Sequence, residues 1–344
     1  MTTGRAGAVG VEAVREYLRQ QPIPDVGEAA TIQPERSVAG ERRFRISGPA
    51  GVVILKRYEP VALESARREA AGLRLGGEVG LAPTLVRLDE AGGALTGPVV
   101  VLQAPRGEVL GHRALTDQEA HGWLFLLLTL HHLPADTVQV PSSMSPDAAT
   151  WRQRNQAAWD ACRAAYTAPE YRPLLDALTM LDAIVTARIE ANRALWRQVT
   201  RRPCHGNPVP AHLTEAQGRL MLLEWEGFGL GDPAMEVGRA AALAALSGEL
   251  TADQYVRFVA DYLAGVRDLR DADLEQRLQI FASVLPLGFS FVALSLLAQG
   301  QTASGDRARD IEQVTRALTW IQDTLGVEAG DPQALLAPLR AAGR

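Results

Sequence analysis

Lysine is almost missing from this sequence of 344 residues, because the 35 basic residues comprise 34 arginines and a single lysine, Lys56. The bias toward arginine is a property of composition and excludes no function by itself. It does make Lys56 informative, since an ammonium ion is a compact point charge that a guanidinium group does not replace. A last remaining lysine must also fall somewhere, so its surroundings decide whether the position has a function.

Other scarce features exclude whole classes of protein. Two cysteines, Cys162 and Cys204, form no disulfide or metal-binding pattern, which is typical of a reducing cytoplasm, where we expect this protein. A net charge of −5 is not the electrostatic signature of a protein that binds nucleic acid, so we expect no such partner. With 47% hydrophobic residues, the chain is also not disordered.

Targeting and membrane-spanning segments are not predicted. Residues 1–20 lack an apolar core followed by a small-residue cleavage site, so they do not resemble a signal peptide. Residues 278–298 have the length of a membrane span, but Pro286, Gly288 and several polar residues interrupt them. A pair of buried helices is the better interpretation, and we expect no membrane association.

The first third of the chain mixes strand and helix patterns. Short runs rich in β-branched residues beside glycine and proline predict strands, and apolar residues spaced by three or four predict helices. The predicted elements are a helix at 9–21, a hairpin of strands at 44–46 and 52–56 that ends at Lys56, a helix at 61–75, and strands at 84–88 and 98–102. This order predicts a small sheet with one helix packed against it.

The remainder of the chain is mostly helical. Helical periodicity covers residues 116–133, 150–200 and the chain from Ala234 onward, with one strand predicted at 220–225. We therefore predict an α+β fold of two lobes. Residues 1–103 would form a lobe around an antiparallel sheet, and residues 104–344 a larger helical lobe.

Candidate functional residues fall near the predicted strands. A lysine after four apolar strand residues can project into a cleft and meet nucleotide phosphates, although most such lysines face water. Glu69 lies beside the buried stripe of the 61–75 helix, where its carboxylate could hold Lys56; without the lysine it would be an ordinary surface glutamate. In the segment 203–213, two prolines and a glycine prevent regular structure, so this loop has a fixed irregular shape.

The segment 220–232 combines an apolar strand with acidic residues. Glu224 closes the strand, which is a common way to present a metal ligand. Asp232, which precedes Pro233, is better interpreted as the N-cap of a helix, with the proline at the first helical position.

In combination, these residues resemble the aminoglycoside phosphotransferase and choline kinase group, which are small-molecule kinases with the protein-kinase-like fold. The resemblance covers roughly residues 35–245, and its most specific part is 203–240. There, His205-Gly206-Asn207 is similar to the family's H-G-D motif, and Glu224-Trp225-Glu226 followed by Gly231-Asp232-Pro233 is similar to its I-D-W-E and G-D-P motifs. The resemblance implies ATP or another nucleoside triphosphate as phosphate donor, Mg²⁺ or Mn²⁺ as metal, and the hydroxyl group of a small molecule as acceptor.

The resemblance also implies a nucleotide-binding set. Lys56 would contact the α- and β-phosphates, with Glu69 as its anchor. The backbone of the segment Gln103–Arg106, which includes Pro105, would meet adenine. A glycine-rich cover over the phosphates would lie near residues 37–40.

At the centre of the implied reaction, three polar positions depart from the family pattern. Asn207 stands at the position of the catalytic aspartate, His212 at that of a metal-binding asparagine, and Glu224 at that of a metal-binding aspartate; His205 and Asp232 would support the site structurally. The amide of Asn207 can orient a hydroxyl group but cannot accept its proton. Glu224 keeps the charge, whereas His212 suits Mn²⁺ or Zn²⁺ better than Mg²⁺.

Two functions therefore remain open. One is an ATP-dependent phosphotransferase, because phosphoryl transfer depends mainly on positioning and electrostatics. The other is a catalytically impaired, kinase-like protein that binds a nucleotide or another ligand. Residues 104–344 carry a net charge of −6, and acidic residues cluster between Asp253 and Asp273. This cluster either attracts a cationic acceptor such as an amino sugar or is an ordinary solvated surface.

Overall fold

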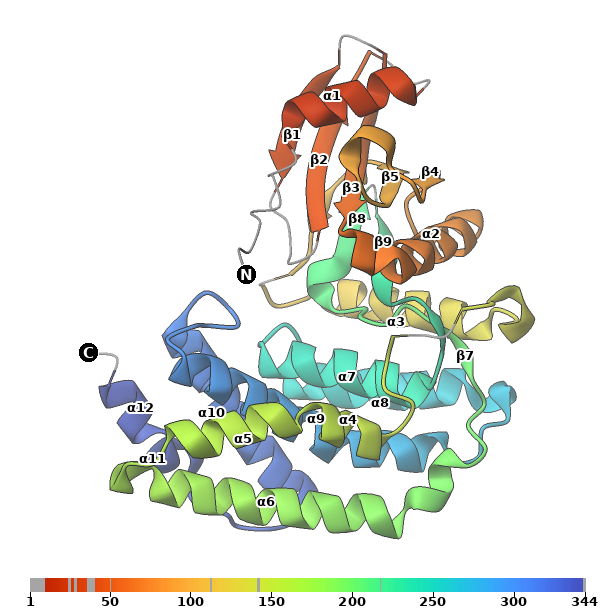
Figure 1. Cartoon of the computed structure of the whole chain (residues 1–344). Helices are drawn as coiled ribbons and strands as arrows, with labels where there is room; N and C mark the ends of the chain where they lie inside the picture. The colour runs from red at the N-terminus through yellow and green to blue at the C-terminus, as the bar shows by residue number, and fades with distance from the viewer. Residues whose placement is uncertain are drawn as a thin grey trace.

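The structure is a computed structural model that describes residues 10–23, 26–27, 30–35, 41–49, 51–111, 113–140, 143–216 and 218–342. A sheet-bearing part, at the top of Figure 1, contains α1, α2 and the strands β1 to β5. A larger part below it consists mainly of the helices α3 to α12. This arrangement and the antiparallel sheet confirm the predicted α+β fold class.

The main sheet has the strand order β1-β2-β3-β5-β4, and all neighbouring strands are antiparallel. Its strands are β1 (Thr31–Glu35), β2 (Glu41–Ser47), β3 (Val52–Tyr58), β4 (Leu85–Asp89) and β5 (Val99–Gln103). The predicted hairpin consists of β2 and β3, but β3 continues to Tyr58, so Lys56 lies inside the strand and not at its end. The sequence does not predict β1, which contains Pro34; this proline is tolerated because β1 is an edge strand that pairs only with β2.

The two faces of the sheet pack against different helices. On β3, Val53 and Leu55 belong to the apolar cluster that includes α1 (Val11–Gln20), whereas Ile54 belongs to the cluster that includes α2 (Leu63–Glu78). Because side chains alternate along a strand, Lys56 leaves the same face as Ile54 and points toward α2. The apolar spacing of α2 places Glu69 on its buried face, where it is 1% exposed.

The helical part is built from ten helices within the described residues. They are α3 (Asp117–His132), α4 (Ala148–Arg154), α5 (Gln156–Ala165), α6 (Arg172–Ala191), α7 (Pro233–Leu246), α8 (Ala252–Gly265), α9 (Leu274–Ala298), α10 (Arg307–Leu325), α11 (Pro332–Leu335) and α12 (Ala337–Ala341). Its apolar core is continuous with the cluster beneath α2, so the helices and that face of the sheet share one core.

Helix α9 corrects one prediction. The expected pair of helices at 278–298 is a single continuous helix that contains Pro286. By length and composition α9 could cross a membrane, but 78% of its apolar window is buried inside the fold, and it packs against α7 and α10. An interior proline costs about 3 kcal/mol of helix stability, and burial of the surrounding apolar side chains offsets it.

Short strands align the two irregular segments that carry the candidate residues. They are β6 (Glu108–Val109), β7 (Arg202–Cys204), β8 (Leu213–Ala216), β9 (Arg219–Leu222) and β10 (Gly229–Gly231). Strand β7 pairs with β10, and β8 pairs with both β6 and β9. The loop between β7 and β8 therefore runs alongside the segment between β9 and β10.

Candidate functional site

Lys56 is buried between the sheet and the segment that follows β9, with 2% of its surface exposed. Its Nζ lies 2.6 Å from Glu69 Oε1 and 2.9 Å from Glu224 Oε2. Burial lowers the pKa of a lysine, but Glu69, Glu224 and Glu41 outweigh it and raise the pKa of Lys56 above its ordinary value. The structure thus brings Lys56, Glu69 and Glu224 together, with the ammonium group charged.

Glu69 has a second partner that sequence reasoning misses. Tyr58, which lies on the same strand face as Lys56, donates a hydrogen bond from its hydroxyl group to Glu69 Oε2. One carboxylate oxygen of Glu69 therefore binds the lysine and the other binds the tyrosine, which fixes the orientation of the carboxylate. The alternation of side chains on β3 was the signal, because Tyr58 lies two residues after Lys56.

Arg43 is a further cation in this cluster that sequence reasoning misses. It lies directly opposite Lys56 in the pairing of β2 with β3, so the two side chains leave the same face of the sheet. Its Nη2 lies 2.7 Å from Glu224 Oε2 and 3.0 Å from Glu41 Oε1. The hairpin could have identified it, because counting outward from the 48–51 turn places residue 43 opposite residue 56.

Glu224 binds two cations through one oxygen atom. Burial opposes ionisation, but Lys56 and Arg43 prevail and lower the pKa of Glu224 to about 2, so the carboxylate is ionised at neutral pH. Its backbone is left-handed, with φ of 63°, which is uncommon for a residue with a side chain. The surrounding structure imposes this conformation, which costs about 1–3 kcal/mol and is typical of functional sites.

The loop after β7 is held by a buried carboxylate on α7. Glu236 Oε1 accepts the backbone N–H of Gly206 over 2.6 Å, and its Oε2 accepts that of His205 over 3.2 Å. Gly206 has φ of +93°, and a Cβ there would lie 2.4 Å from the carbonyl oxygen of Gly227. Only glycine allows the loop to approach the segment after Glu224 so closely.

Glu236 also belongs to a buried group with His131 and Cys204 whose atoms are close enough to bind a metal ion. However, Glu236 Oε2 already pairs with His131 Nε2 over 2.9 Å, in addition to the loop N–H groups. Burial also raises the pKa of the Cys204 thiol well above its ordinary value. This group is therefore better understood as support for the loop.

Asn207 and His212 lie together at the end of that loop. The backbone N–H of Asn207 donates to His205 Nδ1 over 3.2 Å, and His212 Nδ1 donates to the backbone oxygen of Asn207 over 2.8 Å. Burial lowers the pKa of His212, which is therefore neutral at neutral pH with its Nε2 lone pair unprotonated. The backbone N–H of Leu223 donates to the His212 carbonyl over 2.8 Å and ties this group to Glu224.

The donor set of the site decides which divalent metal it fits. Glu224 offers a carboxylate oxygen, and His212 offers an imidazole nitrogen whose partner nitrogen is fixed by a backbone carbonyl, as in many metal sites. Mg²⁺ prefers oxygen ligands, whereas Mn²⁺ also accepts imidazole nitrogen. The residues present therefore fit Mn²⁺ better than Mg²⁺.

His205 is fully buried and fixed at both ring nitrogens. Its Nε2 donates to the Leu223 carbonyl over 2.8 Å, and its Nδ1 accepts from Asn207. Burial lowers the pKa of His205 from 6.5 to about 4, although Glu236 raises it. The neutral ring therefore joins the loop to the segment before Glu224.

This depressed pKa predicts a pH dependence of stability. Above pH 6.5 the imidazole is neutral in both states and stability is complete; as the pH falls toward 4, the unfolded state binds a proton that the folded state does not. We expect this group to remove about 3 kcal/mol from the free energy of unfolding over that range. Denaturant titrations at several pH values will measure it. His205→Gln keeps a donor for the Leu223 carbonyl, and its free energy of unfolding should fall by about 3 kcal/mol less on acidification than that of the wild type. If the variant has the same pH profile as the wild type, the assignment is wrong.

Asp232 acts as the helix cap that the sequence predicts. It is the N-cap of α7, and its Oδ1 accepts the backbone N–H of Ala234 over 3.0 Å. Its Oδ2 also pairs with buried Arg277 over 2.9 Å. Among the described residues no hydrogen bond joins Asp232 to Lys56 or Asn207, so its role here is to fix the start of α7.

The predicted adenine-binding segment follows β5. The backbone N–H groups of Gln103 and Ala104 are already bonded to the carbonyls of Thr84 and Val52, each over 2.9 Å, and Pro105 has no N–H. Any base contact by Pro105 would therefore use its carbonyl oxygen. The predicted phosphate cover at 37–40 lies outside the described residues.

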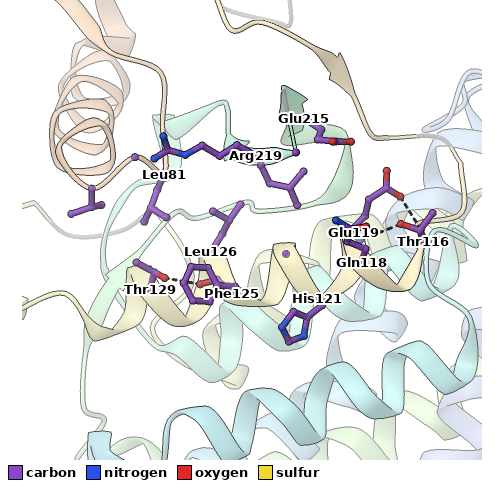
Figure 2. A pocket seen from close by; sticks show the side chains of 15 residues that line it. Leu81, Thr116, Gln118, Glu119, His121, Phe125, Leu126, Thr129, Glu215 and Arg219 are labelled. Carbon is purple, nitrogen blue, oxygen red and sulfur yellow. Dashed lines mark hydrogen bonds between the residues drawn. The ribbon is translucent and has the colours of Figure 1, made fainter.

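A separate cavity of about 440 Å³ lies between α3 and the β8–β9 turn, and Figure 2 shows it from close by. Leu81, Phe125, Leu126 and Arg219 are among its lining residues. It contains none of the residues of the Lys56 cluster or of the loop with Asn207. Those side chains are bonded to one another through ion pairs and hydrogen bonds.

Comparisons with solved structures identify the fold. A candidate aminoglycoside phosphotransferase from Ralstonia eutropha JMP134 is 14% identical, with a TM-score of 0.62 over 92% of this chain and 97% of that one. A choline kinase from Cryptosporidium parvum is 12% identical, with a TM-score of 0.61 over 97% of this chain and 100% of that one. An aminoglycoside phosphotransferase, APH(4)-Ia, in ternary complex with AMP-PNP and hygromycin B is 13% identical, with a TM-score of 0.52 over 92% of this chain and 99% of that one.

Comparison with known sequences gives the family. No curated protein matches this chain. The family model described as the phosphotransferase enzyme family matches residues 31–274, which span β1 to the start of α9 and include Lys56, Asn207 and Glu224. The chain therefore belongs to the phosphotransferase enzyme family and has the protein-kinase-like fold of aminoglycoside phosphotransferases and choline kinases.

Proposed function

We propose that this protein transfers a phosphoryl group from a nucleoside triphosphate to the hydroxyl group of a small molecule. The observation that carries the proposal is the buried Lys56, bonded to Glu69 and Glu224 in a chain of this family. In protein kinases a strand lysine that is paired with a helix glutamate contacts the donor phosphates, and Lys56 on β3 with Glu69 on α2 has this arrangement. The complex of the related APH(4)-Ia with AMP-PNP supports a nucleotide as donor.

Each side chain has a role in this proposal. Lys56 binds the donor phosphates, and Glu69 holds the ammonium in position. Glu224 and His212 hold the divalent cation, which neutralises charge on the transferring group when bound. Asn207 accepts or donates a hydrogen bond that orients the acceptor hydroxyl. Its amide does not take up the proton, so the hydroxyl loses its proton to solvent or to the transferring phosphoryl group.

A second function is favoured by a specific observation, namely the amide at position 207. General-base catalysis contributes about 10²–10⁴-fold to rate, and Asn207 cannot supply it. A protein with this site could bind nucleotide without measurable transfer and serve as a regulated binding module. The two functions share the nucleotide site and differ only in turnover.

Binding and turnover should be measured separately on the full chain. Thermal unfolding with ATP or GTP, in the presence of Mg²⁺, Mn²⁺ or EDTA, measures binding; nucleotide at 100 times its Kd should stabilise the fold by about 2.7 kcal/mol. We expect stabilisation to be larger with Mn²⁺ than with Mg²⁺. Phosphate transfer to a panel of hydroxyl compounds then tests turnover. Transfer supports the phosphotransferase, binding without transfer supports the second function, and the absence of both overturns the proposal.

A further inference from the structure

Arg239 is a cation near Asn207 that has no role in the proposed phosphoryl transfer. It lies on α7, less than one helical turn after Glu236, and its Nη1 donates to the backbone oxygen of Gly206 over 3.0 Å. Gly206 directly precedes Asn207, so the guanidinium group lies against the loop that would orient the acceptor. Its field also reaches His212, whose pKa it helps to lower.

The charge of Arg239 has no counter-ion within the described part of the chain. Lys56 and Arg43 each pair with carboxylates, and Arg277 pairs with Asp232. By contrast, no described carboxylate oxygen lies within 4.0 Å of an Arg239 nitrogen. Glu236 is nearby, but its oxygens already bind the loop and His131.

Leaving this charge unpaired is costly, because Arg239 is partly buried and so loses part of its hydration. Burial lowers the pKa of Arg239, and Glu236 opposes this effect only in part. A guanidinium group carries five N–H donors, and one hydrogen bond is found here. The guanidinium carbon also lies 5.9 Å from the ring centre of Trp151 on α4, which gives it a flat apolar wall on one side. Arg239 is thus a partly buried guanidinium group, held against Gly206 and Trp151, that lies next to the loop with Asn207.

We propose that Arg239 binds an anionic group of the acceptor, so that the substrate is a small hydroxyl compound that carries a carboxylate or a phosphate. Guanidinium groups bind both anions through two parallel hydrogen bonds, which would orient the acceptor as well as hold it. This inference rests on the proposed function and names the chemical class of its acceptor.

The acidic cluster at 253–273, from which a cationic acceptor could be expected, is partly engaged elsewhere. Asp268 pairs with His132 over 3.0 Å, and Asp271 pairs with Arg277 over 2.7 Å. Those partners lie on α3 and α9, away from Asn207 in the hydrogen-bond network. The negative charge of Glu236 also contacts this loop, but it is bonded to two loop N–H groups and to His131, whereas the positive charge of Arg239 has no such ionic partner among the described residues, which favours an anionic acceptor.

Calorimetric titration of the full chain tests the proposal with probes that differ in charge. The probes are inorganic phosphate, glycerate, neutral glycerol and cationic ethanolamine, each titrated with and without saturating ADP. We expect phosphate and glycerate to bind more tightly than the other two. Arg239→Gln should weaken both anions by about tenfold or more. Arg239→Lys keeps the charge but loses the fork, and should give an intermediate loss.

The matched control is Arg257→Gln, which removes an exposed arginine from α8 and should leave all four affinities unchanged. Unchanged anion affinity in Arg239→Gln, or tighter binding of ethanolamine than of glycerate by the wild type, overturns the proposal.

A second source of anion is the terminal phosphate of the nucleotide. If Arg239→Gln weakens ATP but not ADP, and leaves glycerate unaffected, the residue binds the nucleotide and the proposal is again overturned. Failure of the wild type to bind either nucleotide contradicts the proposed function instead, and the titrations without ADP still decide the role of Arg239.

Discussion

Replacing Lys56 by methionine is expected to weaken nucleotide binding at least about 100-fold, because two or more charge-assisted hydrogen bonds to phosphate would be lost. The same change should lower the free energy of unfolding by about 3–5 kcal/mol, since the buried carboxyl group of Glu69 would lose its cation and Glu224 would keep only Arg43. Calorimetry with ADP measures the first effect, and denaturant unfolding the second.

Two further variants separate binding from folding. The double variant Lys56→Met with Glu69→Gln removes the stranded carboxylate, so it should recover stability without recovering nucleotide affinity. Arg67→Met, on the exposed side of α2, is the matched control and should bind nucleotide like the wild type. If the double variant folds and retains wild-type affinity for ADP, Lys56 is a structural residue and the assignment is wrong.

The conservative variant Lys56→Arg uses the composition of the chain. Arginine occupies 34 of the 35 basic positions, so a position that keeps lysine is expected to discriminate between the two. Lys56 is 2% exposed and bonded to two carboxylates, and the larger planar guanidinium group does not fit that space without moving them. We expect Lys56→Arg to preserve charge but to lose at least about tenfold in ADP affinity; wild-type affinity would mean that any cation is sufficient.

The sequence could predict Lys56 and Glu69 as a pair because short-range rules govern both. The alternation of side chains on β3 places Lys56 on a buried face, and the apolar spacing of α2 does the same for Glu69. The one further assumption was that these two faces pack against each other. Arg43 needed one more step, the register of the hairpin. The sequence could not single out Arg239. Its significance is that it has no ionic partner among the described residues, and the sequence does not show which of the 34 arginines lacks one.

The irregular parts of the site show a different limit. Pro286, Gly288 and several polar residues led to the prediction of a helix pair at 278–298. The packing that stabilises one continuous α9 involves residues far away in the chain, so the sequence pattern does not reveal it. Likewise, the sequence marked the 203–213 loop as irregular, but its shape depends on Glu236, which lies on a later helix and accepts two backbone N–H groups. Long-range bonds from side chains to the backbone leave no periodic signal.

Asn207→Asp is expected to raise phosphoryl transfer by about 10²–10⁴-fold, because it supplies the one group that the site lacks, a base for the acceptor proton. The loop is already held in place by His205, Gly206 and Glu236 through contacts that do not involve the Asn207 side chain. A carboxylate of the same shape therefore replaces the amide without changing the loop. The neutral His212, whose Nδ1 lies 3.4 Å from Asn207 Nδ2, provides a polar neighbour for the new charge.

The gain must appear in kcat and not in nucleotide affinity, since Asn207 does not contact Lys56 or Glu224 in the hydrogen-bond network. The measurement is steady-state transfer with saturating ATP and Mn²⁺, together with calorimetric ADP affinity, for the wild type, Asn207→Asp and Asn207→Ala. The alanine variant removes the orienting amide and should transfer more slowly than the wild type while it binds ADP equally well. A large gain in the aspartate variant would mean that the wild-type protein is a phosphotransferase limited by its missing base. If all three proteins bind ADP and none transfers phosphate, the defect extends beyond position 207. The best explanation is then that Lys56 and Arg43 both pair with Glu224 Oε2. A carboxylate oxygen that already binds two cations is a weakened ligand for a metal ion.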